Sequence, residues 1–136
     1  MTYTSNKAVT PFNHIEESRI DFEKFFISVF NICRDPIFVK DDEYRLLIVN
    51  DAFCETFGLS RDEIIGKTLA EKVSLSERES FLAIDKKVLE SGEEIVSEET
   101  LTTNGFNTRT IITRKNRLID AYGTRYIVGE IHDITI

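Results

Sequence analysis

Residues 57–67 read FGLSRDEIIGK, and this stretch separates two different halves of the chain. Gly58 and Gly66 can each adopt the left-handed conformation that ends a helix. Between them, Ser60 and Glu63 have the spacing of a capping box, in which each side chain bonds the backbone amide of the other residue. The stretch therefore predicts that one short helix ends at Gly58 and that a further single helical turn ends at Gly66.

The segment before this stretch has the pattern of a hairpin. Two short apolar runs, residues 37–39 and 46–49, flank the polar residues 40–43 and predict two buried strands. Asn50 follows the second run and can cap the short helix that ends at Gly58.

A longer helix is predicted at the front of the chain, over residues 14–33. Asn13 and Glu16 have capping-box spacing, and the residue before Pro36 avoids the helical region, which ends the helix. We expect the apolar stripe of this helix to be buried on this domain or on a second copy of it. The stripe includes Phe22, Phe25, Phe26 and Val29.

The segment after residue 67 changes from helical to strand periodicity. A helix is expected over residues 76–91, with Gly92 as its end. Strands are then expected over 96–103 and 107–118, on either side of the hairpin signal Asn104-Gly105, and over 122–134. This order predicts an α+β fold, a five-stranded antiparallel sheet with helices over one face, preceded by an amphipathic helix.

Length and composition favour one soluble domain. The 136 residues suit a single core, and the net charge of −7 argues against nucleic acid as a partner. No apolar run is long enough to cross a membrane, and the polar start, residues 1–13, is expected to be flexible and is no secretion signal. We therefore expect a cytoplasmic location.

Cys33 and Cys54 are expected to be buried thiols outside any disulfide.

Four stretches resemble the PAS domain in order and spacing, namely residues 35–39, 48–53, 57–67 and 127–135. The resemblance implies a PAS domain over residues 35–136 after an N-terminal helix over 14–34. It implies a sensory module without catalytic activity, found upstream of a bacterial histidine kinase or diguanylate cyclase. That enzyme would be the C-terminal effector. Three residues resemble the exit motif through which the signal leaves the domain: Asp133, Ile134 and Thr135.

The resemblance also implies a cavity that could hold a small molecule, although the same side chains could simply fill the core. Gly129 has no side chain and would leave space at the sheet. The candidate lining residues are Phe38, Ile48, Phe57, Ile64, Leu69, Phe81, Val88, Thr100, Thr110, Ile112, Ile127, Gly129 and Ile131.

The residues argue against the two common PAS cofactors, so the cofactor stays unknown. In flavin-binding members of the family, a reactive Cys and amide side chains hold the flavin. Leu69 aligns with the Cys, Thr100 and Thr110 with two Asn residues, and Ile131 with a Gln. Haem-binding members take a His from the long helix, and residues 76–91 contain none.

The charged residues have a simple interpretation. His132 alternates with Ile131 and should point away from the cavity. Metal-ligand spacing, phosphate loops and nucleophile motifs are absent from the sequence. Arg109 and Arg114 could meet an anionic ligand or pair with the acids at 93–94 and 98–99, which we expect to be solvated, and pairing is favoured.

Two other functions compete with the ligand sensor. A ligand-free module could dimerise through the stripe of the N-terminal helix, and a homodimer of this kind is also the expected assembly of the sensor. A small enzyme of the ketosteroid-isomerase type would need a carboxylate among apolar strand residues, for which Glu130 and Asp133 are the candidates. The hairpin before the helices does not suit that topology.

Overall fold

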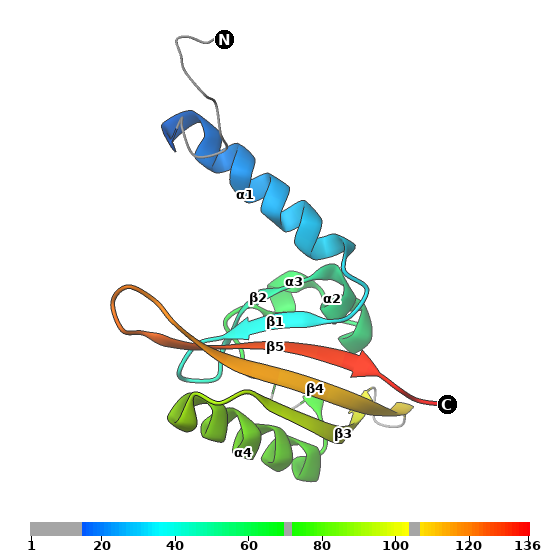
Figure 1. Cartoon of the computed structure of the whole chain (residues 1–136). Helices are drawn as coiled ribbons and strands as arrows, with labels where there is room; N and C mark the ends of the chain where they lie inside the picture. The colour runs from blue at the N-terminus through cyan, green and yellow to red at the C-terminus, as the bar shows by residue number, and fades with distance from the viewer. Residues whose placement is uncertain (1–14, 70–71, 104–106) are drawn as a thin grey trace. The chain divides into compact units, whose positions relative to one another are not determined.

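A computed structural model describes residues 15–69, 72–103 and 107–136, with side chains from residue 21 onward (Figure 1). The chain divides into two compact units, Met1–Ile32 and Cys33–Ile136. The expectations for residues 1–13, for the Asn13 cap and for the Asn104-Gly105 turn lie outside the described residues. The first unit contains α1 (Ile15–Ile32). The second contains β1 (Ile37–Lys40), β2 (Leu46–Val49), α2 (Asp51–Phe57), α3 (Arg61–Ile64), α4 (Leu75–Ser91), β3 (Ile95–Thr103), β4 (Asn107–Ile119) and β5 (Arg125–Asp133).

The second unit is built on one five-stranded sheet with the strand order β2-β1-β5-β4-β3. Every neighbouring pair is antiparallel, and β5 enters the middle of the sheet, with Gly129 opposite Phe38 on β1 and opposite Lys115 on β4. Helix α4 packs against β3, β4 and β5 (Figure 1). The predicted α+β class and antiparallel sheet are confirmed.

The helix ends follow the capping signals in the sequence. The Asn50 side chain accepts a hydrogen bond from the amide of Phe53 at the start of α2, and Gly58 ends that helix with a φ of 65°. Ser60 and Glu63 form both halves of the capping box at the start of α3. Helix α4 begins one residue earlier than predicted because Ser74, whose hydroxyl accepts from the amide of Glu77, is its cap.

The core of the second unit consists of two clusters of buried side chains. The larger cluster joins strands from both halves of the sheet to α2. In it, the ring centroid of Phe53 lies 5.7 Å from that of Phe38 and 4.7 Å from that of Phe57. The smaller cluster contains Val88 and Leu89 of α4 together with Ile127 of β5. These clusters hold α4 and the short helices against the sheet.

Helix α1 carries large apolar side chains at its surface. Phe25 is 66% exposed and Phe26 is 54% exposed, and the ring of Phe26 stacks on that of Phe30. Among the described residues, no helix is long and apolar enough to span a membrane. The expectation of buried cysteines is wrong for Cys33, which is exposed because it follows the end of α1, and Cys54 is only partly buried.

Candidate functional site: a cavity with a buried lysine pair

A cavity of about 280 Å³ lies inside the second unit. Its walls come from β1, β2, α2, α4, β3, β4, β5 and the segment between α3 and α4. Most of the lining is apolar, and Phe38, Phe53, Phe57 and Phe81 contribute aromatic rings. The cavity is therefore suited to a compact apolar group, which aromatic and aliphatic walls hold by burial and dispersion.

Three charged side chains meet in the cavity wall. Asp85 projects from α4 and is 1% exposed. Its Oδ2 lies 2.7 Å from the Nζ of Lys40 on β1, and its Oδ1 lies 2.7 Å from the Nζ of Lys115 on β4. The Lys115 side chain is 3% exposed and that of Lys40 is 15% exposed. One carboxylate is thus shared by two largely buried ammonium groups.

The environment shifts the pKa values of these groups. Burial lowers the pKa of Lys40, because desolvation disfavours the charged ammonium and outweighs the attraction of Asp85. For Asp85, burial alone would raise the pKa, but the charges of Lys40 and Lys115 outweigh it and lower the pKa of that carboxyl. Asp85 is therefore held as an anion, and the two ammonium groups are drawn to the same acid.

The lysines also contact the aromatic wall. The Nζ of Lys115 lies 5.7 Å from the ring centroid of Phe81 and 5.9 Å from that of Phe38, and the Nζ of Lys40 lies 5.4 Å from the Phe38 ring. Ring faces attract cations and partly replace the lost water. The two ammonium groups therefore lie directly beside the aromatic part of the cavity wall.

Arg78 of α4 is a third cation in the lining. Its Nε is buried and has no hydrogen-bond partner within the part of the chain that the structure describes. Buried N–H groups are normally bonded to protein or water, so Arg78 adds positive charge to the lining while its Nε stays without an acceptor.

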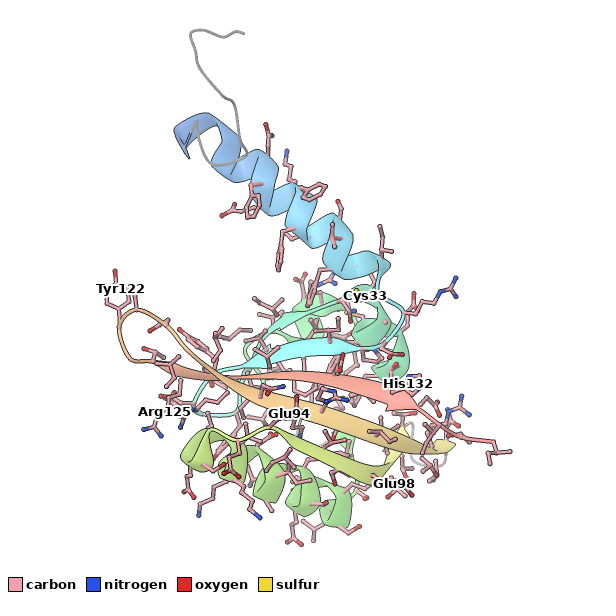
Figure 2. All side chains as sticks on the ribbon, in the orientation of Figure 1. Cys33, Glu94, Glu98, Tyr122, Arg125 and His132 are labelled. Carbon is pink, nitrogen blue, oxygen red and sulfur yellow. The ribbon has the colours of Figure 1, made fainter. Side chains whose placement is uncertain are left out.

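Glu99 of β3 lies inside the domain but outside the cavity lining. Its oxygens accept hydrogen bonds from the hydroxyls of Thr113, at 2.6 Å, and Ser80, at 3.3 Å. Glu99 is 8% exposed, so the expectation that all four acids at 93–94 and 98–99 are solvated is wrong for this residue, which lies on the inward face of its strand. Figure 2 shows Glu94 and Glu98, both exposed.

The predicted exit residues fold back onto the start of β4. Asp133 accepts a hydrogen bond from the amide of Thr135 at 2.8 Å and pairs with Arg109 at 2.9 Å. The Thr135 hydroxyl accepts from the amide of Thr110, and the amide of Ile134 donates to the Thr110 carbonyl, both at 2.9 Å. The bonds from Thr135 lower the pKa of Asp133. Arg109 thus pairs with Asp133 and not with the predicted acids, whereas Arg114 does pair with Glu94 at 3.0 Å.

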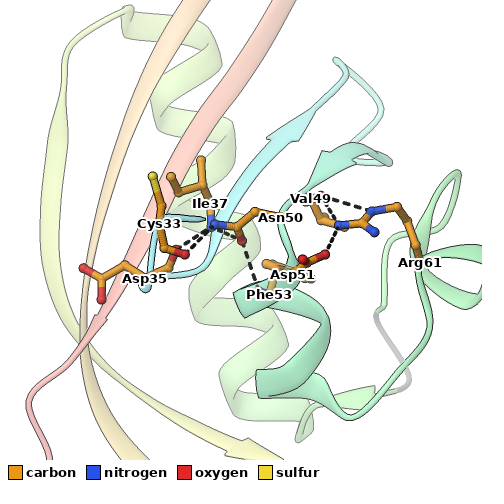
Figure 3. A network of polar contacts seen from close by, with 8 residues as sticks. All are labelled: Cys33, Asp35, Ile37, Val49, Asn50, Asp51, Phe53 and Arg61. Carbon is orange, nitrogen blue, oxygen red and sulfur yellow. Dashed lines mark hydrogen bonds and ion pairs between the residues drawn. The ribbon is translucent and has the colours of Figure 1, made fainter. Parts of the chain in front are cut away.

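A second network joins the entry of the domain to its sheet (Figure 3). The Asn50 side chain is completely buried, accepts from the amide of Ile37 at 2.9 Å, and donates to the carbonyl of Asp35 at 2.9 Å. The Asp35 carboxylate in turn lies 3.0 Å from Nδ1 of His132 on β5. The segment entering the domain is therefore bonded to the strand that leaves it. His132 is exposed, as its alternation with Ile131 predicted.

The family model of the PAS fold matches residues 30–136. The chain belongs to the PAS family. This fold is sensory and generally non-catalytic, and histidine kinases contain such domains. Among the described residues of this PAS domain, no group of three or more His, Cys, Asp or Glu side chains could hold a metal ion.

Comparison with individual proteins agrees with the family. The PAS domain is 34% identical over 122 residues to the uncharacterized protein y4lL of Sinorhizobium fredii, a match that covers 88% of this chain and 15% of that protein. It is 27% identical to the solved PAS domain of BvgS from Bordetella pertussis, with a TM-score of 0.59 and coverage of 85% of this chain and 88% of that one. A 37-residue stretch is 49% identical to the full BvgS, a virulence sensor protein, of which it spans 3%.

A second solved structure, the PAS domain of a two-component sensor histidine kinase, superposes with a TM-score of 0.66 at 18% identity. The match covers 86% of this chain and 99% of that one, and at this identity it shows the shared fold alone.

The structure brings part of the predicted PAS pocket together. The predicted residues that line the cavity are Phe38, Phe57, Leu69, Phe81 and Ile131. Ile64 is completely buried in the larger core cluster, and Val88 and Ile127 are completely buried in the smaller one. These three predicted pocket residues thus pack within the core and do not line the cavity.

The remaining predicted positions lie elsewhere because of the alternation of the strands. On β3 and β4 the inward residues at the cavity are Leu101, Ile111, Thr113 and Lys115, so Thr100, Thr110 and Ile112 fall on the other face. Ile48 is 44% exposed; in β2 the buried residues are Leu46 and Val49, because the pairing with β1 shifts register between them. Gly129 does not line the cavity, because the Phe38 ring fills the space above it: a Cβ at Gly129 would lie 2.2 Å from the ring.

Sequence reasoning missed the charged residues of the site, Lys40, Arg78, Asp85 and Lys115. Lys40 ends an apolar run, and Lys115 lies in a strand whose inward neighbours are Ile111 and Thr113. A lysine in phase with inward residues is the signal that could have identified Lys115. Asp85 occupies an inward position of α4, next to Ile84 and one helical turn before Val88 and Leu89.

Proposed function

We propose that this domain is a non-catalytic sensor that binds a small molecule in its cavity and regulates a C-terminal effector, a histidine kinase or a diguanylate cyclase, in the cytoplasm. The single observation that carries the proposal is the 280 Å³ cavity with its largely apolar walls. Protein interiors are close-packed, with few voids larger than a water molecule. This hollow is partly open to solvent, so a small molecule can enter it, and its apolar, aromatic lining is typical of a ligand pocket.

The strand pairing supports a short route from the cavity to the exit. Ile131 lines the cavity, and Asp133 at the end of the same strand begins the turn that Thr135 closes on β4. Lys115 on the neighbouring strand lies opposite Gly129 of β5. A ligand that repositions β4 relative to β5 would therefore act on the exit turn, and an effect of a few kcal/mol is enough to shift a two-state element.

The proposal is tested by filling the cavity. Leu101 lines it and is 1% exposed, so Leu101→Trp should occupy part of the space, whereas Leu118→Trp adds the same side chain at a 53% exposed position. Small molecules identified by screening the wild-type chain should raise its melting temperature, leave the Leu101→Trp protein unaffected, and still stabilise the Leu118→Trp protein. Equal responses in both variants would show that binding occurs outside the cavity.

A ligand-free dimerisation module is the second candidate, and the exposed aromatic side chains of α1 favour it. Phe25 is 66% exposed and Phe26 is 54% exposed. Large apolar side chains grouped at a surface are typical of a protein–protein contact. In this proposal two copies of the chain pack through α1, and the same contact would serve a ligand-binding sensor. Phe25→Asp should convert dimers to monomers in light scattering, with Ser28→Asp as a charge control on the same helix. An unchanged dimer after Phe25→Asp would contradict it.

A further inference from the structure

We propose that the cavity selects a small organic acid, one carboxylate attached to a compact apolar body, and that Lys40 and Lys115 bind the carboxylate. This inference rests on the proposed sensor function and names the ligand class of the same site. It follows from the excess of cations in the cavity wall, from their unused hydrogen-bond donors, and from the shape of the apolar space beside them.

The charges of the lining do not balance. Lys40, Arg78 and Lys115 line the cavity, and Asp85 is the carboxylate among its described lining residues. Glu99, whose oxygens accept from the hydroxyls of Thr113 and Ser80, lies nearby and its charge also acts on Lys40, so the three cations exceed these two acids by one. A structural ion pair on α4 would need one lysine. A second ammonium group with a 3% exposed side chain costs desolvation energy that an incoming anion would offset.

The lysines also retain donors for a ligand. Each ammonium group has three N–H bonds, and within the described residues Lys40 and Lys115 each donate one hydrogen bond, to Asp85. Both groups lie against the Phe38 ring, which itself lines the cavity. A carboxylate placed beside this ring can accept from both lysines.

The apolar space determines the rest of the ligand. Its volume of about 280 Å³ is at the lower end of the roughly 300–1,000 Å³ of typical ligand pockets, so the body must be small. Phe53, Phe57 and Phe81 form part of the wall, and a phenyl ring or short alkyl chain would pack against them. A phosphate or a multiply charged acid would leave polar atoms against these rings, and a cationic ligand would face three cations and one carboxylate that already binds two of them.

The ligand class can be tested with shape-matched compounds on the 136-residue chain. The acids are benzoate, phenylacetate and hexanoate; the neutral counterparts are benzyl alcohol and benzamide; the cation is benzylamine. Isothermal titration calorimetry should show saturable binding of at least one acid, with neutral compounds about tenfold weaker or more, since a hydrogen bond to a charged group is worth at least that factor. Benzylamine should not bind.

Variants assign the carboxylate contact. Lys115→Met should weaken acid binding about tenfold or more and leave binding of the neutral compounds within about twofold. Asp85 keeps Lys40 as its partner in this variant, so the fold should persist. Lys86→Met removes an exposed lysine from α4 and should leave both affinities unchanged. If Lys115→Met does not fold, the comparison of acids with neutral compounds on the wild-type chain still decides the ligand class.

Each outcome separates the two proposals. Neutral compounds that bind as tightly as the acids, or acid binding that Lys115→Met leaves intact, would overturn the ligand class while the sensor proposal stands. If neither acids nor neutral compounds bind, the ligand class is overturned, and the sensor proposal then depends on the cavity-filling experiment. Acid binding lost in Lys86→Met but kept in Lys115→Met would place the anion on the surface of α4 and contradict the inference.

Discussion

Replacing Asp85 by Asn should strongly destabilise the domain, because Asp85 is the anion shared by two largely buried lysines. Its oxygens lie 2.7 Å from the Nζ atoms of Lys40 and Lys115, and it is 1% exposed. Removing one partner of a buried ion pair leaves uncompensated charge and typically costs about 3–5 kcal/mol. We expect a loss of about this size in the free energy of unfolding, measured by urea denaturation followed by far-ultraviolet circular dichroism.

An exposed ion pair provides the matched control. Glu94 pairs with Arg114 at 3.0 Å, and both side chains are more than 40% exposed, so Glu94→Gln should leave the free energy of unfolding nearly unchanged. The double variant Asp85→Asn with Lys115→Met removes one charge of each sign and should recover part of the loss. If Asp85→Asn costs no more than Glu94→Gln, the lysines are solvated in solution and the description of a buried charged cluster is wrong.

Asp85 should also make the stability of the domain depend on pH, and the sign of the effect follows from the direction of its pKa shift. The pKa of Asp85 is lowered in the folded state, so its contribution to stability is complete above the ordinary carboxyl pKa of about 4 and is lost as the pH falls through the lower folded value. The stability difference between wild type and Asp85→Asn should therefore be constant near neutral pH and shrink below about pH 4. A difference that grows on acidification would contradict the assigned direction.

Two further substitutions test the fold around the site. Asn50→Ala should cost about 2–4 kcal/mol in urea denaturation, because it removes the acceptor of the part-buried Ile37 amide, the donor to the Asp35 carbonyl and the side-chain cap of the Phe53 amide. A loss below about 1 kcal/mol would show that water replaces the side chain. Gly129→Ala should lower the free energy of unfolding by about 1–3 kcal/mol and alter ligand affinity, because the added Cβ displaces the Phe38 ring that lines the cavity. Unchanged stability and affinity would show that the ring has room to move.

The sequence predicted the elements well because their ends have local chemical signals. The capping box at Ser60, the cap at Asn50 and the left-handed Gly58 act within a few residues of themselves, so no knowledge of the tertiary structure is needed to find them. The antiparallel sheet with helices over one face followed from the order of these elements.

The cavity was less predictable because its wall depends on strand phase and on distant pairs. In β4 the residues Thr110 and Ile112 alternate with Ile111 and Thr113, and both sets contain one apolar and one polar residue, so composition does not indicate which faces inward. Strand phase points to Lys115, but the partner that both lysines share is Asp85, which lies 45 residues from Lys40 and 30 from Lys115. The sequence pattern does not show which side chains become partners in the folded structure.

A crystal structure of the chain with the tightest-binding carboxylate tests the central claim most directly. The account predicts electron density inside the cavity, with the apolar body against Phe53 and Phe57 and the carboxylate oxygens about 2.7–2.9 Å from the Nζ atoms of Lys40 and Lys115. Density for the acid on the outer surface at a saturating concentration, or a cavity closed by the side chains of its own wall, would contradict it.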